Sequence, residues 1–231
     1  MTDWDLAPFD SLWDWAGVVL YLLVFPIYHG MYHLASVGTK KTTRRDRFDA
    51  IRESWVERLL AGDNVTVAAQ QTRNLTMVSS ILVSASLILL GITANMLVRV
   101  PQLEQSLPHS DLLGLRPNAL RLKLYCLVVV FVAAFSFCMT ALRYLGNFVL
   151  AIGADPAVIE EHFGSAVGYL SGLANKASHR YTLGVRSFYA AFPLMGWLFD
   201  SRLFVVLTVF WALRFFVFRD ASGPPSPEPE G

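Results

Sequence analysis

The chain has 231 residues, of which 54% are hydrophobic and only 16% are charged, and its formal net charge is +1. A soluble domain carries about 25% charged residues, so this composition argues against an ordinary water-soluble protein. The two cysteines, Cys126 and Cys138, lie in one apolar run, which excludes a disulfide framework and any metal-ligand spacing.

Three uncharged runs indicate the protein class. Residues 15–39 and 74–98 each contain 25 positions without a charge, and residues 124–142 contain 19. A helix of roughly 20 apolar residues crosses the hydrocarbon core of a bilayer, and its backbone is satisfied internally. The sequence therefore predicts an all-α integral membrane bundle, one domain over 1–219, with four to five transmembrane helices and amphipathic helices on the cytoplasmic side.

The first span is expected over 15–37, and a basic cluster follows it. Lys40, Lys41, Arg44, Arg45 and Arg47 come directly after this run. Cytoplasmic flanks carry the excess of lysine and arginine, so we expect the N-terminus outside, in a bacterial inner membrane. The acidic start lacks the basic region of a cleaved signal peptide, so the run is expected to remain a span.

A surface helix is predicted over 43–61. Phe48, Ile51, Trp55 and Leu59 recur at helical spacing on one face, and Gly62 is a plausible stop. Such a helix either lies in the membrane interface or packs against the cytoplasmic end of its own bundle.

The second and third spans are predicted over 74–98 and 122–153. Pro101 is expected to end the second span, and a polar connection follows it on the outer side.

A cytoplasmic helix is predicted over 156–178. Asp155 and Pro156 match the N-cap and the first helical position. Gly164, Gly168 and Gly172 recur at a four-residue period in this segment, and small residues at that spacing allow close helix contact.

The last apolar region covers 182–199 and 203–218, separated by Asp200-Ser201-Arg202. It is either one kinked helix or two spans joined by a tight turn. Two spans give five in total and a stronger excess of basic residues on the inner face, which favours that interpretation. The Pro-rich, acidic tail over 220–231 is predicted to be disordered.

Three motifs carry a resemblance to a known family. The sequence reads QQTRNLTMVSSILVSASLILLG into the second span, LRYLGNFVLAIGADP at the end of the third, and ANKASHRYTLGVRSFYAAFPLMGWLF into the fourth. This series resembles the membrane family catalogued as domain of unknown function 599, over roughly 14–219. The resemblance implies a multi-span membrane protein and no settled activity.

The family pattern at the second span looks like Gln-x-x-Arg-Asn, which here is Gln70, Arg73 and Asn74. Two further family arginines correspond to Arg143 and Arg186. Where family members often have a proline turn, this chain has Asp200-Ser201, a departure at the turn that would begin the fifth span.

Arg143 interrupts the third apolar run. It either reaches toward the cytoplasmic interface or faces the bundle interior and binds an anion, with Asn147, Asn74 and Ser79 as polar neighbours. Arg73 and Arg186 are either positive-inside anchors or form a basic vestibule with Arg143 that suits phosphate groups.

His29 and His33 have the spacing of two metal or haem ligands on one helix face, but the sequence offers no further ligand. Histidines hydrogen-bonded in the bundle or at the interface explain them better, so no cofactor is expected. The sequence has no glycine-rich phosphate loop, nucleophile elbow or paired intramembrane carboxylates, and we expect no enzyme activity.

Three functions follow from these patterns. The first is an oligomeric pore or carrier for a small anion, with a buried Arg143 as the anion contact. The second is an accessory subunit that packs in a larger membrane complex through its aromatic spans and the three glycines. The third is a redox protein that uses His29 and His33. Expected partners are membrane lipid and a second copy or another membrane protein, with no nucleic acid.

Overall fold

The computed structural model describes residues 12–27, 44–63, 65–106 and 117–220, and the all-α fold is confirmed there. These residues contain helices and no strand. The elements are α1 (Leu12–Leu22), the π-helical segment η1 (Leu23–Ile27), α3 (Arg44–Leu60), α4 (Val65–Ser106), α5 (Pro117–Ile152), α6 (Pro156–Phe163), α7 (Ala166–Phe199) and α8 (Ser201–Asp220).

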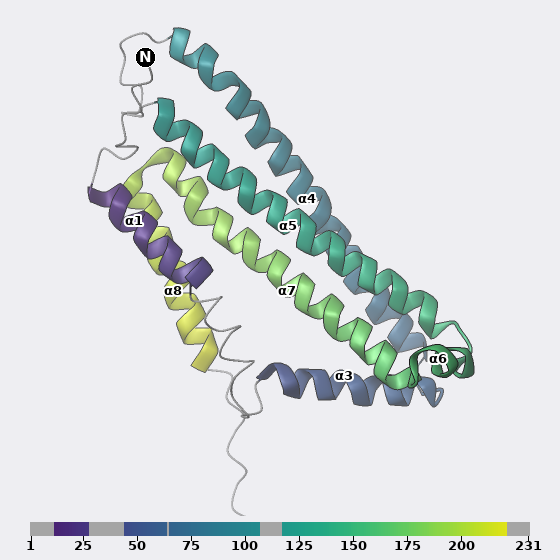
Figure 1. Ribbon diagram of the computed structural model, residues 1–231. Coiled ribbons are helices and arrows are strands. Elements are labelled where there is room, and N and C mark those ends of the chain that lie inside the picture. The colour runs from purple at the N-terminus through teal and green to yellow at the C-terminus, as the bar shows by residue number, and fades with distance from the viewer. Residues whose placement is uncertain (1–11, 28–43, 64, 107–116, 221–231) are drawn as a thin grey trace, which may run out of the picture.

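Three long helices form the shaft of the molecule. The helices α4, α5 and α7 contain 42, 36 and 34 residues and lie side by side, with α5 packed against both others (Figure 1). At 1.5 Å per residue their lengths are about 50 to 63 Å. We call the end that carries α3 and α6 the basal end. The opposite end, where α7 turns into α8 and α1 packs beside α8, is the apical end.

Two helices are long and apolar enough to cross a membrane, by length and composition, within the described residues. They cover Thr66–Gln102 and Ala119–Ile152, while the apolar stretch Leu12–Phe25 is shorter. Only 11% and 33% of their most apolar windows are buried, whereas the core helix of a soluble protein is mostly buried.

The helix α4 differs from the predicted second span at both ends. It begins at Val65 and continues through Pro101 to Ser106, so the prediction that Pro101 ends this helix is wrong. A proline removes a single backbone donor, and the turns on either side keep their own hydrogen bonds.

The predicted cytoplasmic helix over 156–178 is two helices. The side chain of Asp155 caps α6 by accepting from the Ala157 N–H at 2.9 Å. Gly164 then ends α6 with a φ of 83°, which glycine adopts without strain. Ser165 caps the start of α7, because its hydroxyl accepts from the Gly168 N–H at 3.1 Å. From there α7 runs unbroken to Phe199.

The three glycines therefore do not share a helix face. Gly164 lies outside α7, and a Cβ on Gly172 would meet no atom within 4 Å. The close approach of helices occurs elsewhere, at Gly184, where a Cβ would overlap the Cys138 sulfur of α5. A role of Gly168 and Gly172 in packing against another chain stays a prediction.

The last apolar region forms two helices. Asp200, with extended backbone, separates α7 from α8, and α8 folds back along the shaft (Figure 1). Trp197 stacks on Phe204 across this turn with ring centroids 4.6 Å apart. Both belong to the apical core, together with Leu127, Phe131, Ala191 and Leu194.

A second core lies at the basal end. The buried side chains of Val56, Phe148, Leu170 and Leu173 join α3 to α5 and α7. Leu59 of the stripe predicted on α3 is buried, as packing against its own bundle requires, whereas Phe48 and Ile51 are 45% and 61% exposed. The alternative that this helix lies in the membrane interface stays a prediction.

Candidate functional site

A cavity of about 410 Å³ lies between four helices at the basal end. Residues of α3, α4, α5 and α7 all line it. The lining residues are Ile51, Arg52 and Trp55 of α3, Gln71, Thr72, Leu75 and Ser79 of α4, Leu145 and Phe148 of α5, and Ala174, Ala177, Ser178 and Tyr181 of α7. This volume is in the range of small-molecule sites.

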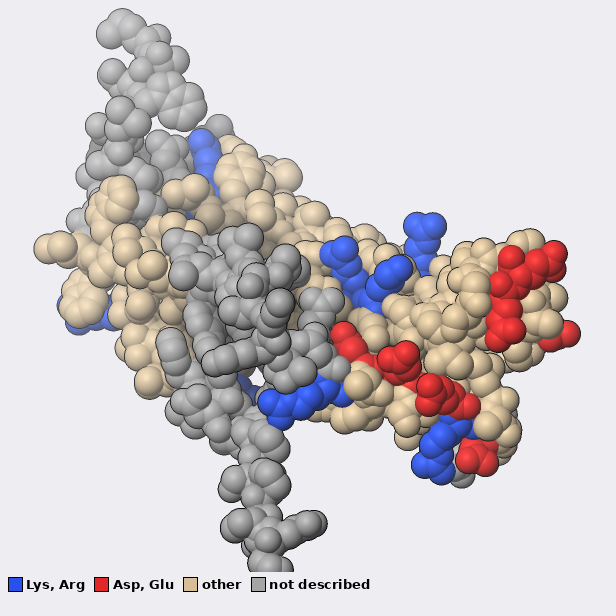
Figure 2. All heavy atoms as spheres, turned by 60° about the horizontal axis from the view of Figure 1, so that its bottom comes forward, with Lys and Arg blue, Asp and Glu red and all other residues tan. Residues whose placement is uncertain are grey.

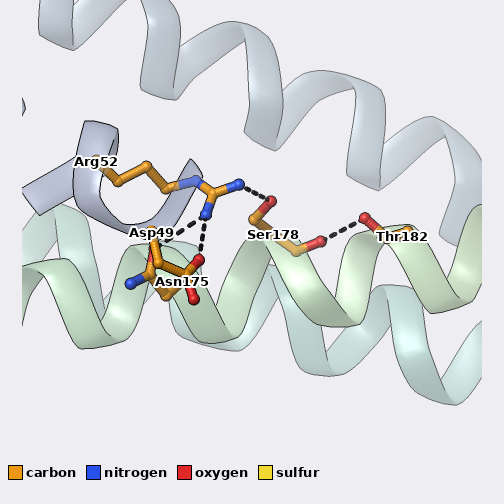
Figure 3. A network of polar contacts seen from close by, with 5 residues as sticks. All are labelled: Asp49, Arg52, Asn175, Ser178 and Thr182. Atoms are coloured by element: carbon orange, nitrogen blue, oxygen red, sulfur yellow. Dashed lines mark hydrogen bonds and ion pairs between the residues drawn. The ribbon is translucent and has the colours of Figure 1, made fainter. Parts of the chain in front are cut away.

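Arg52 fastens α3 to α7 at the edge of the cavity (Figure 3). Its Nη1 donates to Asp49 Oδ1 at 2.7 Å and to Asn175 Oδ1 at 3.0 Å, and its Nη2 donates to Ser178 Oγ at 2.8 Å. Thr182 Oγ1 in turn donates to the carbonyl of Ser178 at 2.8 Å. The guanidinium is thus held in one orientation, and the Asp49 carboxylate balances its charge.

Aromatic rings pack α3 against α5 beside the cavity. Trp55 of α3 stacks on Phe148 of α5 with centroids 5.9 Å apart, and Val56 beside it is fully buried. This packing joins α3 to the shaft and leaves a wall of carbon atoms facing the cavity.

A stripe of small hydroxyl residues lies on the buried face of α4. Thr72, Ser79, Ser86 and Thr93 are buried at seven-residue spacing. A seven-residue repeat keeps one face of a long helix against its neighbour, and small residues there let backbones approach closely.

Ser79 is the exception within this stripe. The hydroxyls of Thr72, Ser86 and Thr93 each donate to the carbonyl four residues earlier, at 2.9, 2.7 and 2.7 Å. The Ser79 hydroxyl is buried, lines the cavity, and has no hydrogen-bond partner among the described residues. Burying a hydroxyl without a hydrogen-bond partner costs folding free energy. The Ser79 hydroxyl is therefore free to form a hydrogen bond with a ligand.

The cavity combines apolar walls with a few polar groups. Such a site suits a molecule with an apolar body and a polar group that accepts hydrogen bonds from Ser79 or the Arg52 edge. No three His, Cys, Asp or Glu side chains gather as metal ligands in the part of the chain that the structure describes.

The prediction of a buried Arg143 is wrong for the single chain, in which its side chain is exposed. The buried positions of α5 include Ala141 and Leu145, and 100° per residue sets Arg143 on the opposite side of the helix. Once the buried positions of α5 are known, the helical period places Arg143 outside the interior of the single chain.

The other predicted polar residues also lie outside the core. Gln70, Arg73, Asn74 and Asn147 are exposed, and none of them bonds to another or to Arg143 in the described structure. Arg73 lines a separate hollow beside Leu59 and Val149. Arg186 is half-buried and interacts with neighbouring groups. His29, His33 and the tail from residue 221 lie outside the described residues.

Sequence patterns did not bring together the residues that line the cavity. Ser79 was expected only as a possible neighbour of Arg143, and Arg52, Asn175 and Ser178 were not singled out. The seven-residue spacing of hydroxyl residues in α4 was the one available signal. The contact of Arg52 with Asn175, 123 residues away, has no signature in either segment.

A second polar cluster lies at the apical end and is fully bonded. Asp14 Oδ1 accepts from Trp197 Nε1 at 2.7 Å and from Ser201 Oγ at 2.5 Å. Lys123 is 4% exposed and donates to the Trp197 carbonyl at 2.9 Å, with its ammonium 5.0 Å from the Trp197 ring centroid. This cluster ties α1, α5 and α7 to α8 and has a structural role.

Comparison with known proteins gives a family without an activity. A family model described as "Protein of unknown function, DUF599" matches residues 16–223. No curated protein and no solved structure matches the chain.

Proposed function

The chain belongs to the DUF599 family, and we propose that it is a non-catalytic, multi-pass membrane protein that binds an amphipathic small molecule at its basal end. The observation that carries this proposal is the basal cavity, with its apolar walls and the unpartnered Ser79 hydroxyl.

Exposed apolar side chains on the shaft support a membrane environment. Ile81, Ile88 and Ile92 of α4 are 59%, 62% and 54% exposed. Soluble proteins rarely expose apolar surface over such a length, whereas lipid covers it without cost.

Figure 2 shows acidic side chains gathered at the basal end, and the exposed acids there include Glu53, Glu57, Glu160 and Glu161.

We infer five spans, from the first apolar run, α4, α5, α7 and α8. The reversal at Asp200 and the 20 residues of α8 support the fifth. The basic residues that precede and begin α3 favour a cytoplasmic basal end and an outside N-terminus, in a bacterial inner membrane.

Ligand binding is tested on the purified full-length protein by thermal denaturation with and without a fluorescent fatty acid. Wild type is expected to bind the probe and to unfold at a higher temperature with it. Ala174→Leu places a larger side chain in the cavity, so it is expected to remain folded and lose the probe. Gly172→Ala, where the added Cβ meets open space, is the matched control. Equal probe binding by Ala174→Leu and wild type would contradict the proposal.

A second candidate is the oligomeric anion pore. Arg143 and Asn147 are exposed on one face of α5, so they would line a pore only between copies of the chain. Anion flux into liposomes that is present in wild type and lost in a folded Arg143→Ala variant would support it. Flux that Arg143→Ala leaves unchanged would remove Arg143 from the pathway.

The other two predicted functions can be distinguished by purifying the protein. An accessory subunit copurifies with a larger complex in mild detergent. A redox protein that uses His29 and His33 is coloured or carries metal after purification.

A further inference from the structure

We propose that the basal cavity holds one acyl chain of a glycerophospholipid, and that Ser79 donates a hydrogen bond to the ester carbonyl of that chain. This inference rests on the proposed function, because it names the ligand of the same cavity.

The first argument is the match of donors to acceptors. The Ser79 hydroxyl is fully buried and without a described partner, whereas the equivalent hydroxyls of Thr72 and Ser86 are bonded within α4. An acyl ester offers a carbonyl acceptor and no donor, which complements a free O–H. A single water is a poorer occupant, because a buried water needs two to four polar partners and the surrounding walls are mainly carbon.

The second argument is the apolar wall. Trp55, Leu145 and Phe148 face the cavity, together with Ala174 and Ala177. A water-soluble ligand would leave these side chains in contact with polar groups, whereas an acyl chain fills the space with methylenes.

The third argument is depth. Ser79 lies five residues beyond Asn74, where the uncharged run of α4 begins, which is about 7.5 Å along the helix. Along α4, which starts at the basal end, Ser79 is the last residue that lines the cavity. Its hydroxyl is therefore a donor within the apolar part of α4, where we propose that lipid rather than water is the neighbouring medium.

The charge of Arg52 makes the proposal more specific. Asp49, 2.7 Å from the guanidinium, already balances that charge. A lipid with an anionic headgroup therefore binds with little more affinity than one with a zwitterionic headgroup. The ester carbonyl is the group that the site recognises.

The experiment compares diester and diether phospholipids with identical headgroups and chain lengths, by native mass spectrometry of the full-length protein. A diether lacks the carbonyl but keeps the apolar body. Wild type is expected to retain one diester lipid, with affinity about five to tenfold above the diether, the range of one hydrogen bond. Soluble glycerophosphate is expected not to displace it.

Two serine variants complete the test. Ser79→Ala is expected to reduce diester binding to the diether level. Ser80→Ala is the matched control, because this exposed hydroxyl is bonded to the Thr76 carbonyl at 2.9 Å and lies outside the cavity lining. It is expected to keep the wild-type preference.

Two results would overturn the inference. Equal affinity of wild type for diester and diether removes the carbonyl contact, and so does a diester preference that survives Ser79→Ala. If either result occurs while Ala174→Leu still abolishes fatty-acid binding, the proposed function stands and only the lipid assignment fails. If Ala174→Leu binds both ligands as wild type does, both proposals fail.

Discussion

Asp14 at the apical end and Ser79 at the basal end are both buried polar side chains, but their surroundings differ. Asp14 accepts hydrogen bonds from Trp197 and Ser201, and the buried Lys123 lies near enough to attract its charge. Ser79 has no described partner and lines a cavity. A satisfied buried network rigidifies the structure that contains it, whereas an unsatisfied group beside a cavity indicates a place for a ligand. The comparison separates an end whose buried polar groups are bonded within the bundle from the end where we propose that a ligand binds.

The largest effect is expected from Asp14→Ala. Removing the carboxylate leaves the Trp197 N–H without this acceptor and the charge of Lys123 without this counter-charge, which costs about 3–5 kcal/mol of unfolding free energy. Chemical denaturation in detergent measures it. Asp155→Ala, an exposed helix cap, is the control and is expected to cost about 1 kcal/mol. Adding Lys123→Met to Asp14→Ala is expected to recover part of the loss, and equal losses for the two aspartates would contradict the comparison.

The next effect tests the packing between the two ends. Gly184→Ala places a Cβ against the Cys138 sulfur and is expected to cost about 1–3 kcal/mol through overpacking. Gly146→Ala on α5, where a Cβ meets open space, is expected to be neutral or to stabilise by about 0.5–1 kcal/mol through helix propensity. Thermal denaturation of both variants measures the difference. A loss of similar size in Gly146→Ala would show that the effect is not local packing.

A smaller effect is expected at the edge of the cavity. Arg52→Gln removes contacts to Asp49 and Ser178, and since the side chain is 28% exposed we expect a loss of about 1–2 kcal/mol. Hydrogen exchange should rise across α3 and remain unchanged at the apical end. Arg58→Gln is the control, because its ion pair with Asp63 is 3.6 Å long and exposed. Faster exchange at both ends would mean that α3 is not an independent layer.

The smallest effect has opposite signs at two serines. In lipid-free detergent, Ser86→Ala loses a hydrogen bond and is expected to destabilise by about 0.6 kcal/mol. Ser79→Ala removes an unsatisfied hydroxyl and is expected to stabilise by up to about 1 kcal/mol. Matched denaturation curves of delipidated protein test this contrast. Destabilisation of the same size by Ser79→Ala would indicate that its hydroxyl already has a partner.

Local pattern was enough for much of the fold. Uncharged runs predicted α4 and α5, and periodic apolar residues with a glycine stop predicted α3. Local pattern failed where two signals competed. Pro101 was expected to stop a helix that continues past it, and the glycine period at 164–172 crosses the break between α6 and α7.

Composition and the spacing within single segments were enough to predict the helical class, the family and the positions of the two apolar helices α4 and α5, although not their full lengths. Only the tertiary structure decided which polar residues are buried. Arg143 was the most conspicuous charge in the sequence and lies exposed, whereas Arg52 and Ser79 both line a cavity between four helices. The physical reason is that burial of a side chain depends on which neighbouring helices cover its face, and that arrangement is set by packing between segments more than 100 residues apart.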